Sequence, residues 1–115
     1  MAISEFEIRR VEKLASDFVD AHRPPAHVRP QLDIGYRLSG QSLEFFEIRP
    51  KWDKPSEILE QSFAKATFVK KNRIWKLYWM RQDLKWHSYE PVAEAGTLEE
   101  VLAVVSEDAF GCFRG

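Results

Sequence analysis

Residues 63–81 alternate between apolar and polar side chains on both sides of a turn signal at Lys71-Asn72. A period of two is typical of a β-strand, because successive side chains of a strand point to opposite faces of the sheet. Pairing the two halves about the turn predicts a hairpin with one apolar face for a core and one half-polar face for solvent or a partner. The apolar face would hold Ala64, Ala66, Phe68, Trp75, Leu77 and Trp79, and the half-polar face Lys65, Thr67, Val69, Ile74, Lys76, Tyr78 and Met80.

An earlier hairpin is predicted between Leu32 and Pro50, with its turn at Ser39-Gly40-Gln41. Pairing about that turn brings Ile34, Tyr36 and Leu38 to the same face as Leu43 and Phe45, and Arg37 to the same face as Glu44. The alternation breaks after Phe45, which predicts a β-bulge or a strand end buried on both faces. Residues 49–55 form a proline-bracketed loop, and residues 57–61 are expected to make one helical turn.

Helices are predicted at both ends of the chain. Apolar residues recur at three- and four-residue spacings over residues 4–23, where Ser4 and Glu7 have the spacing of a capping box and Pro24-Pro25 ends the pattern. Thr97 and Glu100 have the same spacing before a second helix, for which Gly111 is the expected stop. The order helix, hairpin, hairpin, helix predicts an α+β fold, a two-layer sandwich in which a four-stranded antiparallel sheet carries both helices on one face.

The length of 115 residues is that of one domain, which we expect to span residues 1–115. No apolar run is long enough for a signal peptide or a membrane span, so a cytoplasmic protein without a membrane partner is expected. Cys112 is the only cysteine, and no two histidines lie four residues apart, so we expect no disulfide, no metal site and no cofactor. The chain also lacks the glycine motifs of nucleotide-binding loops and the GxSxG motif of serine hydrolases.

Charge is unevenly distributed along a chain whose formal net charge is -1. Residues 61–90 hold seven Lys and Arg against two acids, whereas residues 91–115 hold five acids against one Arg. The basic hairpin favours an anionic partner, although the overall pI of about 6.3 is below the usual value for nucleic-acid-binding domains. Whether the acidic last helix packs against the hairpin and neutralises it is left open by the sequence.

A basic and aromatic cluster on the half-polar face is the strongest candidate site. Its members on and after the hairpin are Lys65, Lys76, Tyr78, Arg81, Lys85, Trp86, His87 and Tyr89. Such combinations bind single-stranded nucleic acid, because cations follow the phosphates while flat rings stack on bases. The leading hypothesis is therefore a small binding module for an anionic partner, either nucleic acid or an acidic protein surface, rather than an enzyme. The plainer interpretation of the same charges is a solvated sheet face.

The segment after the hairpin carries a second candidate arrangement. Its ionisable residues Arg81, Asp83, Lys85 and His87 alternate with Gln82, Leu84 and Trp86. This is the period of an extended segment, so Arg81 and His87 would hold a phosphate or carboxylate between them while Asp83 orients the histidine. In the plainer alternative Asp83 pairs with Arg81 or Lys85, and the two apolar residues enter the core.

Two further functions remain as alternatives. The first is a metal-dependent phosphodiesterase or nuclease, using Asp83 and His87 or the pair Asp33 and Glu47, with Glu44 and Lys65 on adjacent strands. Cross-strand salt bridges are the plainer account of those acids. The second alternative is a structural homodimer that pairs through the apolar residues of the open sheet face, which are Val69, Ile74, Tyr78 and Met80.

Four segments resemble the small bacterial family known as domain of unknown function 3024. They are RPPAHVRPQLDIGYRL, FFEIRPKWDKPSE, AKATFVKKNRIWKLYWMRQDLKWHSYEP and EDAFGCFRG. The resemblance covers nearly the whole chain and implies no activity, cofactor or functional residue. It directs attention to a groove that Arg49 and Trp52 would form with Arg81, Trp86 and His87. Such a groove requires Arg49 and His87 to lie within about 15 Å of each other, which is the span of one ligand site.

Overall fold

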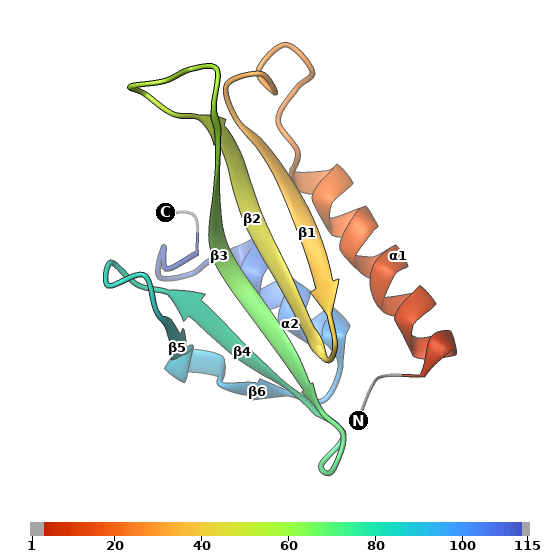
Figure 1. Ribbon diagram of the computed structural model, residues 1–115. Helices are drawn as coiled ribbons and strands as arrows, with labels where there is room; N and C mark the ends of the chain where they lie inside the picture. The colour runs from red at the N-terminus through yellow and green to blue at the C-terminus, as the bar shows by residue number, and fades with distance from the viewer. Residues whose placement is uncertain (1–3, 114–115) are drawn as a thin grey trace.

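The computed structural model describes residues 4–113 and has an α+β architecture (Figure 1). In chain order the elements are α1 (Glu5–His22), β1 (Asp33–Ser39), β2 (Ser42–Pro50), β3 (Ile58–Val69), β4 (Ile74–Met80), β5 (Trp86–Ser88), the 3-10 helix η1 (Glu90–Val92), β6 (Glu94–Ala95) and α2 (Leu98–Glu107). The strands form one antiparallel sheet in the order β1-β2-β3-β4-β5, and β6 pairs with β4 beside β5. The predicted fold class is confirmed, with six strands in place of four.

The first hairpin has the predicted register. Ser39 pairs with Ser42 across the turn, where Gly40 has a φ of 59°, and Tyr36 pairs with Phe45. After Phe45 the pairing with β1 stays regular, and Phe45 and Phe46 are both buried, so β2 is buried on both faces there, as the second predicted alternative states. A bulge lies in the pairing with β3, because Phe45 pairs with Ala64 whereas Phe46 pairs with Ser62. One extra residue of β3 is thereby inserted into the ladder, which re-aims the chain that precedes it.

The prediction of a helical turn over residues 57–61 is wrong. Residues 58–61 instead begin β3 and pair with Glu47–Pro50 of β2. The pairing extends two residues beyond β1, because Asp33 at the start of β1 lies opposite Ile48. The last residues of β2, the first residues of β3 and the loop of residues 51–57 between them form an arm that projects from the sheet at the top of Figure 1.

The prediction that residues 81–87 form one extended segment is also wrong. The Arg81 N–H donates to the Lys85 carbonyl at 3.2 Å, and the Leu84 N–H donates to the Arg81 carbonyl at 2.9 Å. Leu84 has a φ of 61°, which closes a tight turn between β4 and β5. Met80 consequently pairs with Trp86, which places Trp86 on the same face of the sheet as Met80 and Tyr78.

Both helices begin at the predicted caps. The Ser4 hydroxyl accepts from the Glu7 N–H at 3.3 Å, and the Thr97 hydroxyl accepts from the Glu100 N–H at 3.2 Å. The second helix ends at Glu107 rather than at Gly111, because Asp108 adopts the left-handed conformation (φ 45°) that terminates helices. No helix in residues 4–113 is long and apolar enough to cross a membrane.

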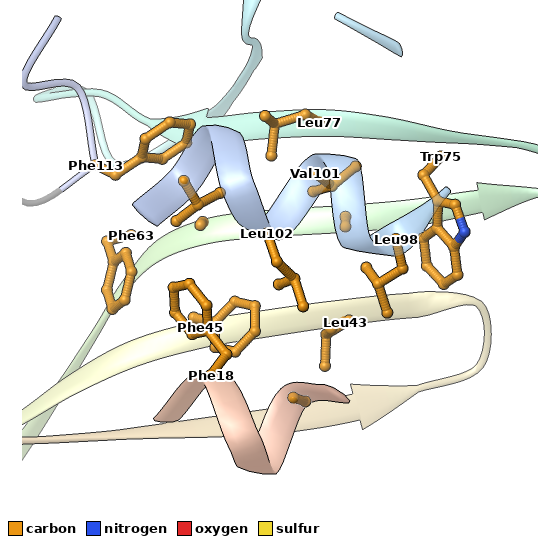
Figure 2. Close-up of a cluster of buried hydrophobic side chains, with 14 of the residues drawn as sticks. Phe18, Leu43, Phe45, Phe63, Trp75, Leu77, Leu98, Val101, Leu102 and Phe113 are labelled. Atoms are coloured by element: carbon orange, nitrogen blue, oxygen red, sulfur yellow. The ribbon is translucent and has the colours of Figure 1, made fainter. Parts of the chain in front are cut away.

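The core lies between the two helices and one face of the sheet (Figure 2). Phe18 of α1 packs against Phe45 with 4.7 Å between ring centroids, and Leu98 and Leu102 of α2 point toward the sheet. The acidic α2 therefore covers the side of the sheet opposite Lys65 and does not neutralise that residue's face. Its Glu99 is ion-paired to Arg10 of α1.

Candidate functional site

Within residues 4–113, no helix packs on one face of the sheet, and we call it the open face. The cross-strand partners Arg37, Glu44, Lys65, Tyr78 and Ser88 form a single row across its five strands. Lys65 and Tyr78 are both half-buried by their neighbours on the sheet. Because α1 and α2 pack on the opposite face, this row is available to a partner.

Lys65 lies at the centre of the open face, between two aromatic rings. Its Nζ is 5.0 Å from the ring centroid of Tyr78 and 5.0 Å from that of Trp86. Both distances are within the range of a cation–π interaction, which amounts to about 0.5–1 kcal/mol at exposed sites. The side chain is therefore held in the plane of the face, next to two rings that remain partly exposed.

A second cation–π pair lies two strands away. The Arg37 guanidinium is 4.7 Å from the Phe46 ring centroid and is ion-paired to Glu60 at 2.7 Å. The Phe46 ring covers Gly35, its cross-strand partner, and leaves no room for a side chain at that position. Glu44 accepts a hydrogen bond from the Ser62 hydroxyl, which gives the acid of the central row a neutral partner.

The turn after β4 positions a separate group of polar residues. Asp83 pairs with His87, whose Nε2 is 2.8 Å from the carboxylate, and accepts the Lys85 N–H at 3.0 Å. The hydrogen bond from His87 is the main reason that the pKa of Asp83 lies below its usual value. The Arg81 guanidinium is 5.4 Å from the ring centroid of Trp79.

The hydrogen-bonded pair of Asp83 and His87 agrees with the hypothesis of an oriented histidine, although a turn creates it instead of an extended strand. His87 lies opposite Trp79, on the helix-covered face, so this pair is separated from Lys65 by the sheet. A hollow of about 350 Å³ borders His87, Arg81 and Glu90. Its rim thus carries both charge signs.

The structure brings together only part of the expected binding set. Lys65, Tyr78 and Trp86 meet on the open face, and Lys76 occupies the next position of β4 on that face, opposite Glu94. Lys85 is exposed in the turn. The alternative in which Leu84 and Trp86 enter the core is wrong, since Leu84 is 71% exposed and Trp86 contacts Lys65.

Tyr89 does not belong to a binding surface. It is 2% exposed and packs against Phe113 with 4.7 Å between ring centroids. Burial raises the pKa of its hydroxyl. The expectation that Tyr89 would stack on a partner is therefore wrong, because its N–H donates to the carbonyl of the core residue Leu77 at 2.9 Å and its side chain faces the core.

The groove expected around Arg49 and Trp52 is not formed. Arg49 pairs with Leu59 and Trp79 with Ala64, so the two positions are about 17 Å apart along β3 at about 3.3 Å per residue. His87 lies opposite Trp79 on β5, one strand farther from Arg49, so it is more distant still. Trp52 is 94% exposed on the arm.

The acids of the metal-dependent alternative have other partners. Asp33 accepts two hydrogen bonds from Arg23, both at 2.8 Å, and Glu47 is ion-paired to Arg49 at 2.7 Å. The Arg23 hydrogen bond is the main reason that the pKa of Asp33 lies below its usual value. Within residues 4–113, no group of three or more His, Cys, Asp or Glu side chains is arranged to hold a metal ion.

Sequence reasoning did not select Arg37 and Phe46 as site residues. The signals were present, because Arg37 was placed on the charged face and Phe46 was out of phase with the apolar one.

Residues 3–115 match the family described as "Domain of unknown function (DUF3024)". The chain belongs to this family. No curated protein and no solved structure matches the chain. Since the DUF3024 description names no activity, the function must be argued from the open face itself.

Proposed function

We propose that the open face binds single-stranded nucleic acid. The observation that carries the proposal is the position of Lys65 between Tyr78 and Trp86, on the face that no helix covers. A cation flanked by two flat rings offers an ionic contact for a phosphate and two stacking surfaces for bases. Sheet faces with exposed aromatic residues are a common form of single-strand recognition.

The geometry of the row favours a flexible single strand over a duplex. The aromatic residues come from neighbouring strands, β4 and β5, and adjacent strands lie about 4.8 Å apart. Bases stack on such rings only when they are unpaired and splayed out, because a duplex keeps its bases stacked on one another. Lys65 and Lys76 then contact the backbone on either side of the stacked bases.

Salt dependence of binding tests the phosphate contacts. With about two phosphates neutralised, the affinity for a single strand should fall about sevenfold between about 50 and 200 mM salt, following a slope of about -0.7 per contact. Fluorescence anisotropy with labelled oligo-dT and oligo-U measures this slope, and a duplex of the same length should bind more weakly. Binding that does not respond to salt contradicts the proposal.

A pair of charge-matched variants tests the location of the site. Lys65→Gln removes the central cation and should both weaken binding and reduce the salt slope. Lys71→Gln removes the same charge from the exposed β3–β4 turn and should change neither. If both variants weaken binding equally, the attraction is a general effect of charge and the open face is not the site. Preference for an acidic protein over the oligonucleotides also contradicts the proposal.

The place of action proposed with this function is the bacterial cytoplasm, where single-stranded RNA is abundant. The phosphodiesterase alternative is not favoured, because two of the acids that it would use, Asp33 and Glu47, are ion-paired to Arg23 and Arg49. The polar character of the central row, with Glu44 and Lys65 at its middle, likewise does not favour a homodimer through the same face.

A further inference from the structure

β3 is longer than the strand beside it, which leaves part of its edge uncovered. β4 pairs with β3 only from Ala64 to Val69. Residues 58–62 pair with β2 on one side, and within residues 4–113 no strand pairs with them on the other. Figure 1 shows this part of β3 running upward beyond β4 into the arm. We call residues 58–62 the free edge.

Exposed apolar side chains gather along the free edge and at its two ends. Ile58 is 68% exposed and Leu59 is 41% exposed on the edge itself. Trp52, 94% exposed, lies on the loop at the outer end. At the inner end Leu84, 71% exposed, lines a hollow of about 290 Å³ together with Met80. Only two other large apolar residues in the described part of the chain are as exposed, and neither lies on a strand.

The loop at the outer end has a defined conformation. The Lys51 N–H donates to the Glu57 carbonyl at 3.0 Å, and the Glu57 N–H donates to the Lys54 carbonyl at 2.8 Å. The Glu57 carboxylate is also ion-paired to both lysines. Trp52 is therefore presented on a folded loop, so little conformational freedom is lost when it contacts a partner.

We infer that the free edge is an interface with a second copy of this chain. A two-fold axis perpendicular to the sheet runs two copies of the edge antiparallel to each other and joins the two sheets through backbone hydrogen bonds. The axis brings the loop of each copy to the hollow of the other, because loop and hollow lie at opposite ends of the same edge. One symmetry operation thus makes two equivalent contacts between a loop and a hollow, one at each end of the paired edges.

The charges select the register of this pairing. With Glu60 on the axis, two glutamates would face each other directly, which destabilises an antiparallel pair. A shift of one residue places Leu59 opposite Leu59 of the second copy and Ile58 opposite Glu60. Apolar side chains then meet at the centre, so the pairing centred on Leu59 is the favoured one.

The available area indicates a weak, reversible dimer. Two Trp52 side chains at about 200 Å² each supply about 400 Å², whereas stable interfaces bury at least about 1,200 Å². The remainder must come from the strand pair, Ile58, Leu59 and Leu84. We therefore expect sedimentation velocity to show a monomer that converts to dimer over about a hundredfold rise in concentration.

Engineered cysteines test the register in a Cys112→Ser background. Residues directly opposite each other have Cα atoms about 4.5–5.5 Å apart, within the range for a disulfide. Leu59→Cys should therefore form a disulfide-linked dimer on mild oxidation. Gln61→Cys should not, because its two copies would be separated by about 13 Å along the strands. Ala103→Cys, exposed on α2, measures the rate of random collision.

Three results would overturn the inference: cross-linking of Leu59→Cys no faster than that of Ala103→Cys, cross-linking of Gln61→Cys in its place, or a monomer at every concentration. A second variant, Leu59→Lys, should raise the dimer dissociation constant at least about tenfold while circular dichroism shows an intact fold. The interface lies outside the row centred on Lys65, so dimerisation and oligonucleotide binding can fail independently of each other.

Discussion

Gly35→Ala should destabilise the protein, although replacing a strand glycine by alanine normally has the opposite effect. Gly35 lies on the open face beneath Phe46. A Cβ atom at this position would be 3.1 Å from both Cε1 and Cζ of the Phe46 ring and 3.6 Å from Ile48 Cδ1. The ring must therefore move, and the Arg37 guanidinium 4.7 Å from its centroid must move with it.

Two opposing effects set the magnitude. The loss of glycine's freedom in the unfolded chain stabilises by about 0.4–1 kcal/mol, whereas overpacking destabilises by about 1–3 kcal/mol. Phe46 is 7% exposed, so the ring has little room to relax and overpacking should be the larger effect. We expect the free energy of unfolding to fall by about 1 kcal/mol.

Urea denaturation of matched glycine variants checks this reasoning. Gly96→Ala meets no atom within 4 Å and should stabilise the protein by about 0.4–1 kcal/mol. Gly40→Ala also meets none, but its φ of 59° should make it destabilising by about 1–2 kcal/mol. Phe46→Leu should relieve part of the Gly35→Ala penalty in a double-mutant cycle. Equal effects at Gly35 and Gly96, or no coupling to Phe46, would refute the argument from the close contact.

Three shorter predictions concern binding and titration. Trp86→Ala should weaken single-strand affinity about 5- to 150-fold in anisotropy titrations, since one base loses its stacking surface, whereas Phe6→Ala on α1 should leave it unchanged. Asp33→Asn should lower stability at neutral pH but not in strong acid, as measured by urea midpoints at both pH values. Because Arg23 holds the pKa of Asp33 below its usual value, this stabilisation is present above the unfolded-state pKa and is lost as the pH falls through the folded one. His87→Gln should move the pKa of Asp83 toward its usual value, as followed by carboxyl NMR, because the His87 hydrogen bond is the main cause of the shift.

Both hairpins and their registers could be predicted from the sequence, because each depends on local alternation and a recognisable turn. Gly40 supplies the positive φ that its turn needs, and the apolar side chains of both Phe45 and Phe46 mark the point where β2 is buried on both faces. The caps at Ser4 and Thr97 are equally local. Such features need only neighbouring residues, so a single sequence contains them.

The turn between β4 and β5 could not be predicted in this way. It places Leu84, a branched residue, at a φ of 61°, where glycine or asparagine is the usual signal. Counting the strand period through this hidden turn treated residues 81–87 as one extended segment, whereas the Arg81 N–H donates to the Lys85 carbonyl across the turn. The start of β3 was missed for a related reason, since residues 58–61 become a strand only through pairing with β2.

The order of the strands also bears on how the chain folds. Each of β1 to β4 pairs with the strand that follows it in the sequence, and β6 returns to β4, so every closure between strands spans a short stretch of chain and the topology is of the rapidly folding kind. The exception is α2, the last element, which brings Leu98, Val101 and Leu102 to a sheet completed before it. During synthesis the nascent sheet therefore emerges with Trp75 and Leu77 uncovered, and it is protected against aggregation only when α2 leaves the ribosome and docks.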